Sequence, residues 1–154
     1  MIRKKIYVDQ DMVLANFNKA YNEDRKKYPD QLYPQSQFGF FLKLEEIEDA
    51  IDAVKMLEAH FDVYILTRPS VYNINSYSEK ALWIFNRLGI KTLENTILCC
   101  DKSLFKGAYL IDDSKGDGQP EFDGEWIQFG TDKFPNWKNV IDYILDKEFD
   151  IDNL

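Results

Sequence analysis

Four apolar stretches of this sequence are each followed at once by polar or charged side chains. After the first stretch, at 6–8, two carboxylates follow two residues apart, Asp9 and Asp11. Like charges about 4 Å apart repel by roughly 4 kcal/mol at the effective dielectric of a protein site, so a cation has to offset them. The other three stretches are followed by a hydroxyl, two basic groups and three carboxylates: Thr67 and Arg68, Asp101 and Lys102, and Asp112 and Asp113.

This set of side chains suits the transfer of a phosphoryl group assisted by a metal ion. Converging carboxylates without His or Cys are hard oxygen ligands, which favour Mg²⁺. A lysine and a hydroxyl beside the metal can neutralise the charge that is spread over the phosphoryl oxygens during transfer. One carboxylate can act as nucleophile and another as general acid and base. We therefore predict a Mg²⁺ cofactor and a small phosphorylated substrate.

Each motif by itself also has a purely structural interpretation. An Asp-x-Asp pair is often a turn or a helix cap, and Thr67 before Arg-Pro can simply end a strand. The DDSKGDG stretch at 112–118 is rich in residues that turns prefer. The prediction of a site depends on the motifs occurring together, because each of the four groups of polar residues follows a predicted strand, in chain order.

The elements that must position these groups alternate along the chain. The sequence predicts strands at 6–8, 62–67, 96–100, 108–113 and 125–130, and helices at 13–28, 43–61, 76–89 and 136–147. Ser76 and Glu79 have the spacing of a capping box, and Gly89 is expected to end that helix. The alternation predicts a Rossmann-like, three-layer α/β fold, with a parallel sheet between helices. In such sheets ligands bind beyond the carboxyl ends of the strands, where the polar groups fall.

The composition limits the range of partners and locations. The 154 residues, of which 45% are hydrophobic, suit one domain over 1–154, and 27 acidic against 19 basic residues disfavour binding of polymeric nucleic acid. No apolar run approaches the ~20 residues of a membrane span, and the first apolar stretch ends at Val8, so neither a membrane nor a signal peptide is expected. Cys99 and Cys100 are expected to be reduced, buried thiols in a cytoplasmic protein. The sequence leaves the oligomeric state open.

The motif set resembles the haloacid dehalogenase superfamily and, within it, the 5′(3′)-deoxyribonucleotidase family. DQDMVLANF at 9–17, VYILTRPS at 63–70 and CCDKSLFKGAYLIDD at 99–113 are similar to that family's motifs, and the resemblance covers 5–115 apart from the cap. It implies a Mg²⁺-dependent phosphomonoesterase with an aspartyl-phosphate intermediate. The implied substrates are small phosphates such as (deoxy)nucleoside monophosphates.

The resemblance also implies a role for each matching residue. Asp9 would be the nucleophile and a metal ligand, and Asp11 the acid/base residue with its backbone carbonyl on the metal. Thr67 and Lys102 would hold phosphoryl oxygens, and Lys102 would also restrain Asp9. Three matches remain: Asp113 as a direct metal ligand, Asp112 as a ligand through water, and Phe17 as the aromatic that flanks a nucleobase.

Three positions depart from the family pattern. Met12 stands where a small residue is usual and would crowd the nucleophile loop, while Arg68 stands in place of a second hydroxyl. Arg68 could replace a phosphate-binding lysine that would fall at Val71. The segment from 29 to 38 replaces a longer helical cap, so that 18–41 would form a reduced cap or lid. Five aromatic residues could belong either to this lid or to the core: Tyr28, Tyr33, Phe38, Phe40 and Phe41.

Two functions of other classes compete with the phosphatase. A phospho-acceptor regulatory module of the receiver type also gathers Asp, Thr and Lys around Mg²⁺, but it accepts the phosphoryl group after the third strand and lacks a terminal Asp-Asp pair. A nucleotide- or phosphate-binding protein without catalysis is the other alternative, suggested by Met12 and the short cap. Phosphate release that is lost in an Asp9→Asn variant would separate the enzyme from both.

Overall fold

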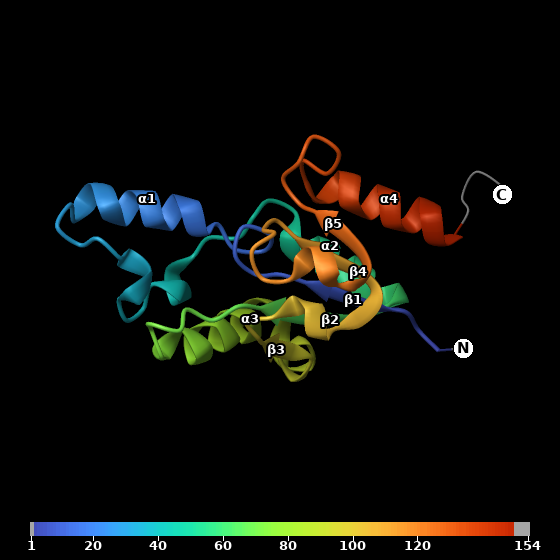
Figure 1. Cartoon of the computed structure of the whole chain (residues 1–154), viewed down its shortest axis with the longest axis horizontal. Helices are drawn as coiled ribbons and strands as arrows, with labels where there is room; N and C mark the ends of the chain where they lie inside the picture. Colours follow the sequence, from blue (N-terminus) through green and yellow to red (C-terminus); the bar gives the residue numbers. More distant parts are fainter. Residues whose placement is uncertain (1, 150–154) are drawn as a thin grey trace.

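The structure is a computed structural model that describes residues 2–149, and five parallel strands form its central sheet (Figure 1). The strands lie in the order β3-β2-β1-β4-β5, with β1 in the middle. All four strand pairs are parallel, so the carboxyl ends of the strands meet at one edge, and the predicted Rossmann-like α/β sheet is confirmed. Their bounds are β1 (Lys5–Val8), β2 (Asp62–Thr67), β3 (Thr96–Leu98), β4 (Lys106–Asp112) and β5 (Asp123–Gln128).

Alternate residues of the central strands serve two different cores. Ile6 and Val8 of β1 pack in a large cluster, while Tyr7 between them packs in a smaller one on the opposite face. The large cluster includes buried residues of four helices: α1 (Phe17–Lys27), α2 (Ala50–His60), α3 (Asn75–Glu94) and α4 (Trp137–Phe149). On the opposite face, Phe105 and Phe122 pack on Tyr7, directly after the 3-10 helices η3 (Lys102–Leu104) and η4 (Gln119–Glu121). The third layer of this fold is therefore thin and largely aromatic.

Two helices begin later than the sequence predicts, for one shared reason. Helix α1 (Phe17–Lys27) begins four residues after position 13, and α2 begins seven residues after position 43. Residues 14–16 instead pair with 45–47 as extended chain: Asn16 N–H donates to the Glu45 carbonyl and Ile47 N–H to the Leu14 carbonyl, each at 2.8 Å. The apolar residues before α1 are therefore buried in a loop. Their interpretation as the apolar stripe of a helix is wrong.

The predicted capping box at the start of α3 is also wrong. Ser76 lies inside the helix, where its hydroxyl accepts from Ser70 N–H at 2.9 Å and donates to the Ser70 carbonyl at 3.0 Å. Glu79 accepts instead from Gly39 N–H at 2.6 Å and from Phe41 N–H at 3.1 Å. Gly89 breaks the helix as expected, with φ of +84°, but one further turn continues to Glu94.

Two other expectations are corrected by the exposure of the side chains. Strand β3 ends at Leu98, before the two cysteines, and these free thiols are not buried: Cys99 is half-buried and Cys100 is exposed. Of the aromatic residues in 28–41, some belong to the core and the others are exposed, so each alternative holds for part of the set. Phe40 and Phe41 belong to the core beside η2 (Phe41–Lys43), whereas three others are exposed on either side of η1 (Pro34–Ser36): Tyr28, Tyr33 and Phe38.

Helix α1 and the segment after it extend away from the sheet, on the side where the strands end (Figure 1). This places 17–43 beside the carboxyl edge of the sheet, next to the start of α3. Within 2–149, no helix has the length and apolar character that crossing a membrane requires.

Candidate active site

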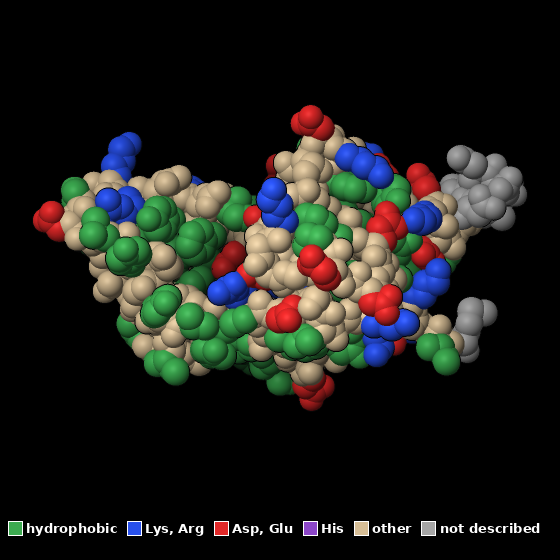
Figure 2. Space-filling view, in the orientation of Figure 1, with side chains coloured by type: hydrophobic (Ala, Val, Ile, Leu, Met, Phe, Trp, Pro, Cys, Tyr) green, Lys and Arg blue, Asp and Glu red, His purple; other side chains and the backbone are tan. Residues whose placement is uncertain are grey.

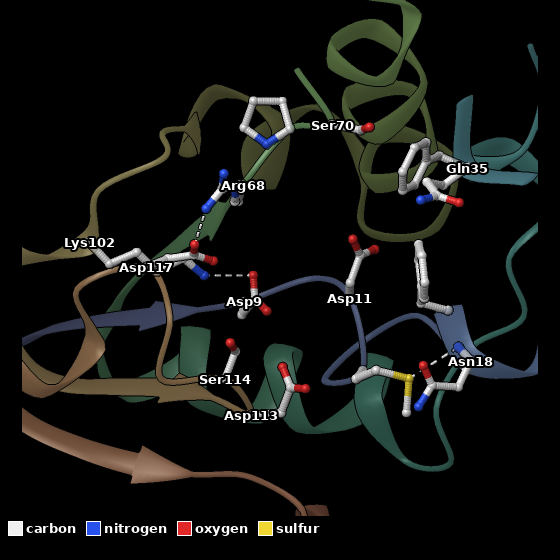
Figure 3. A pocket seen from close by; sticks show the side chains of 14 residues that line it. Asp9, Asp11, Asn18, Gln35, Arg68, Ser70, Lys102, Asp113, Ser114 and Asp117 are labelled. Carbon is white, nitrogen blue, oxygen red and sulfur yellow. Dashed lines mark hydrogen bonds and ion pairs between the residues drawn. The ribbon is translucent and has the colours of Figure 1, made fainter. Parts of the chain in front are cut away.

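A pocket of about 370 Å³ lies beyond the carboxyl ends of β1, β2 and β4 (Figure 3). Its floor carries charged side chains that follow β1 and β4 or begin η3: Asp9, Asp11, Lys102 and Asp113. Its wall carries side chains of α1, η1 and η2, which are Phe17, Asn18, Gln35 and Phe41. The sheet therefore delivers the charged groups, and the segment from 17 to 43 supplies an aromatic and amide-lined side.

The loop after β1 aims both of its carboxylates into this pocket (Figure 3). Asp9 N–H donates to the Ile111 carbonyl at 2.9 Å and so continues the pairing of β1 with β4. The Gln10 carbonyl then accepts from three backbone N–H groups, at residues 13, 14 and 15, which closes a tight turn. Met12 has a φ of +62° in this turn, and its sulfur accepts from Asn18 N–H at 3.3 Å at the edge of the pocket.

Lys102 is the centre of charge on the floor of the pocket. Its ammonium is buried, 2.8 Å from the Asp9 carboxylate, and it also forms an ion pair with Asp112. Burial disfavours the charge of this lysine, but attraction to the two carboxylates outweighs burial, so the pKa of Lys102 lies above its ordinary value. Lys102 N–H donates to the Asp117 carbonyl at 2.7 Å, which fixes η3 beside the pocket.

Three carboxylates on this floor approach one another closely enough to share a cation. Asp9, Asp112 and Asp113 each offer an oxygen within 4.8 Å of the other two. Burial, and then the negative charge of Asp9, raise the pKa of Asp112 to about 6 and that of Asp113 to about 7. Lys102 thus offsets only part of the repulsion. Three hard oxygen donors that repel one another fit a divalent cation such as Mg²⁺.

A second buried lysine, which the sequence motifs did not include, lies beside Asp11. The Lys80 ammonium of α3 is 2.6 Å from the Asp11 carboxylate and 3.0 Å from the Thr67 hydroxyl. Burial raises the pKa of Asp11, and Lys80 only partly opposes this. The sequence does contain a signal for Lys80, because it lies three and four residues before Trp83 and Ile84, on the apolar stripe of the helix. A charge on a buried stripe needs a partner.

The other predicted residues divide between the pocket and its surroundings. Thr67 is fully buried under Lys80 and does not line the pocket, and Asp112 is fully buried behind Lys102. Arg68 lies at the mouth, where it forms an ion pair with Asp117 (Figure 3). Phe17 lines the wall, with its ring 5.8 Å from Tyr21 and 5.3 Å from Phe40 between centroids.

One known protein family matches most of this chain. Residues 28–145 match the model of the family described as 5′ nucleotidase, deoxy (Pyrimidine), cytosolic type C protein. This chain belongs to that family. The resemblance to 5′(3′)-deoxyribonucleotidases is thereby confirmed, and the chain is a phosphoric monoester hydrolase of the nucleotidase type.

Relatives with similar names support the family. A "Putative 5′(3′)-deoxyribonucleotidase" of Vibrio phage KVP40 is 36% identical over 143 residues, which cover 90% of this chain and 83% of the relative. The human "5′(3′)-deoxyribonucleotidase, cytosolic type" is 32% identical over 105 residues, which cover 67% of this chain and 47% of the relative. A solved structure described as a "putative haloacid dehalogenase-like hydrolase" from Burkholderia xenovorans matches over 71% of each chain, at 12% identity and a TM-score of 0.40.

Proposed function

We propose that this chain is a Mg²⁺-dependent phosphomonoesterase that hydrolyses small phosphates, such as deoxyribonucleoside monophosphates, through an aspartyl-phosphate on Asp9. The observation that carries the proposal is the position of Asp9, between the Lys102 ammonium at 2.8 Å and the carboxylates of Asp112 and Asp113. Asp11 lies two residues further on in the same pocket.

In the first half of the reaction, an Asp9 carboxylate oxygen attacks the phosphorus atom and the bond to the ester oxygen breaks. The leaving oxygen takes a proton from Asp11, whose pKa is raised by burial, which favours the protonated form that a general acid needs. In the second half, Asp11 accepts a proton from a water molecule that attacks the phosphorus. The bond between phosphorus and Asp9 then breaks, and inorganic phosphate leaves.

The cationic groups of the floor hold charge during both steps. Lys102 restrains Asp9 and neutralises phosphoryl oxygens, while Lys80 orients Asp11 and Thr67. The side chains of Asp9 and Asp113 and the backbone carbonyl of Asp11 would hold the Mg²⁺, with Asp112 bound to it through water. When bound, the ion supplies positive charge to the phosphoryl group and relieves the repulsion among the carboxylates.

The substrate is assigned from the wall of the pocket and from the relatives' names. Phe17 lines this wall and offers a ring on which a base can stack. Residues 18–41 would act as a reduced cap within a single domain of residues 1–154. Arg68 would break its ion pair with Asp117 and bind the substrate at or beside its phosphate group. A cytoplasmic location stays a prediction from the two cysteines, Cys99 and Cys100, which are free thiols.

A panel of phosphate esters tests the proposal. The full chain would be incubated with deoxyribonucleoside 5′- and 3′-monophosphates, ribonucleotides and small sugar phosphates, with Mg²⁺ or with EDTA, and released phosphate would be measured. We expect release only with Mg²⁺, and none from Asp9→Asn. The matched control is Asp123→Asn, which changes an exposed aspartate at the amino end of β5. Release that is equal in Asp9→Asn, or that is independent of divalent cations, would contradict the mechanism.

A further inference from the structure

The wall of the pocket holds one buried polar atom that the proposed reaction does not use. Two oxygens of lining side chains are buried without a hydrogen-bond partner among residues 2–149, Asp11 Oδ1 and Gln35 Oε1. The first belongs to the proposed acid/base residue, and the second lies across the pocket from Lys102 (Figure 3). A buried carbonyl oxygen costs free energy unless it accepts a hydrogen bond, so Gln35 Oε1 points to a donor on a bound ligand.

The backbone of Gln35 is fixed from two directions. Gln35 is the middle residue of η1, in which Gln37 N–H donates to the Pro34 carbonyl at 3.0 Å. From the loop before α3, the buried side-chain amide of Asn73 donates to the Gln35 carbonyl at 2.9 Å. The side chain therefore extends from a fixed point, which reduces the conformational entropy that a ligand must remove on binding.

The surroundings of Gln35 favour a neutral donor over a charged one. Residues 31–42 contain no Lys, Arg, Asp or Glu, and Figure 2 shows apolar side chains gathered over this part of the molecule. Two cations that flank the segment have other partners, because Arg25 donates to the carbonyls of residues 29 and 31 and Lys43 pairs with Asp24. Burying a charged group against this wall would cost more than burying a neutral N–H.

A nucleobase combines a neutral N–H with a flat ring. Phe17 lines the same wall as Gln35 and offers a ring on which a base can stack. Proteins that recognise single bases stack them on aromatic side chains and form hydrogen bonds with their pairing edges. A glutamine amide suits such an edge, because it can accept one hydrogen bond and donate another to the same base. A sugar phosphate has hydroxyl donors but no ring to stack.

We propose that Gln35 is a specificity-determining residue, whose Oε1 accepts a hydrogen bond from an N–H on the pairing edge of the substrate's base. The inference rests on the proposed function, since it requires the phosphate group beside Lys102 and the base beside Phe17. It adds that a donor on the base defines the substrate class. Nucleotides whose base lacks this N–H, and sugar phosphates without a base, bind more weakly.

Isothermal titration calorimetry of the full chain tests the inference. The chain carries Asp9→Asn, so that a bound nucleotide is not turned over, and Mg²⁺ is present. The probes are thymidine 5′-monophosphate, whose base has a single N–H on its pairing edge, and the N3-methyl analogue, in which a methyl group replaces that hydrogen. The analogue is expected to bind roughly tenfold more weakly, because Gln35 Oε1 is then left without a partner.

Three further substitutions in the same chain assign this preference to one atom. Gln35→Leu keeps the approximate size of the side chain and removes its oxygen, so the two probes should then bind within about twofold of each other. Gln35→Glu keeps an acceptor oxygen and should keep the preference. The matched control is Gln37→Leu, which changes an exposed glutamine of the same segment that does not line the pocket and should also keep the preference. Thermal unfolding checks that each variant is folded.

The outcomes separate this inference from the proposed hydrolysis. Equal binding of the two probes to the chain with Gln35 intact, or no binding of either, would overturn the inference. A preference that survives Gln35→Leu would overturn it as well and would assign the N–H to another acceptor, such as Asn18. If the preference is lost only in Gln35→Leu while the wild type releases no phosphate, the inference stands and the proposed hydrolysis fails.

Discussion

The floor of the pocket consists of paired charged side chains, whereas its wall consists of uncharged ones. On the floor, the buried ammonium of Lys102 bridges Asp9 and Asp112, and the charges compensate one another where water is largely excluded. On the wall, Phe17, Gln35 and Phe41 carry no charge. The proposed reacting groups are therefore held by short-range ion pairs, whereas the wall offers aromatic rings and amide groups, which we propose recognise the substrate.

Helix α3 ties the two regions together through neighbouring residues. Glu79 accepts hydrogen bonds from the backbone of Gly39 and Phe41 on the wall, while Lys80 holds Asp11 on the floor. Both side chains are buried at the start of the helix. The difference between floor and wall can be tested residue by residue, because a floor substitution should change turnover and a wall substitution should change substrate affinity.

The largest effect is expected from Lys102→Met, which removes the cation of the floor. Turnover should fall by roughly 10³-fold or more, because Asp9 loses its restraint and the phosphoryl oxygens lose a positive charge. Stability should also fall by about 3–5 kcal/mol, since two buried carboxylates lose their partner. Phosphate release and urea unfolding measure the two effects. Turnover within tenfold of the wild type would show that Lys102 does not serve the reaction.

A smaller loss is expected from Lys80→Met, of roughly 10²-fold in kcat. Lys80 lowers the pKa of Asp11 against the larger effect of burial, so without it the pKa of Asp11 should rise. The alkaline limb of the kcat profile, where the acid form of Asp11 is lost, should therefore move to higher pH. Lys80→Arg keeps the charge and serves as control. An unchanged pH profile in a folded Lys80→Met variant would refute this role.

The wall is tested by Phe17→Ala, with an expected increase of about tenfold in KM for deoxyribonucleotides, or about 1.4 kcal/mol. The value of kcat should change little, since Phe17 carries no charge and lies on the wall of the pocket. Tyr21→Ala is the matched control, because Tyr21 stacks on Phe17 but does not line the pocket. Equal KM values for the two variants would argue against stacking of a base on Phe17.

The last prediction concerns stability rather than turnover: the pH dependence of unfolding when no metal is bound beside Asp113. Burial and the charge of Asp9 raise the pKa of Asp113 from 3.8 to about 7. The folded state binds the proton more tightly than the unfolded state, so metal-free stability should fall as pH rises from about 4 to 7. Asp113→Asn should raise the metal-free unfolding temperature at pH 8 by roughly 5–10 °C, since a partly screened shift of this size corresponds to about 2–3 kcal/mol and each kcal/mol to about 2–4 °C.

The same unfolding temperatures can be measured with Mg²⁺ present. It should stabilise the wild type and stabilise Asp113→Asn much less, because ligand binding to the folded state adds to stability. Thermal unfolding at pH 5 and pH 8, with EDTA or with Mg²⁺, gives all the required values. If Mg²⁺ raised both unfolding temperatures equally, Asp113 would not be a ligand of the ion.

Sequence patterns predicted the elements that form through local periodicity. The alternation of apolar strands with amphipathic helices predicted the parallel sheet, and residues 62–67 form β2 as expected. The same patterns failed before α1 and α2, because Asn16 and Ile47 form hydrogen bonds with each other's segments across about 30 residues of chain. The patterns also predicted that Glu79 caps the start of its own helix, although its hydrogen-bond partners are backbone N–H groups of 39–41.

The sequence by itself determined which groups follow the strands, since parallel strands must bring the residues after their carboxyl ends to one edge. Only the tertiary structure decided how these groups are paired: Lys102 with Asp9 and Asp112, and Lys80 with Asp11 and Thr67. The physical reason is the range of the interactions. Hydrophobic periodicity acts between near neighbours in the chain, whereas the partner of a buried charge depends on which distant side chain shares its low-dielectric surroundings.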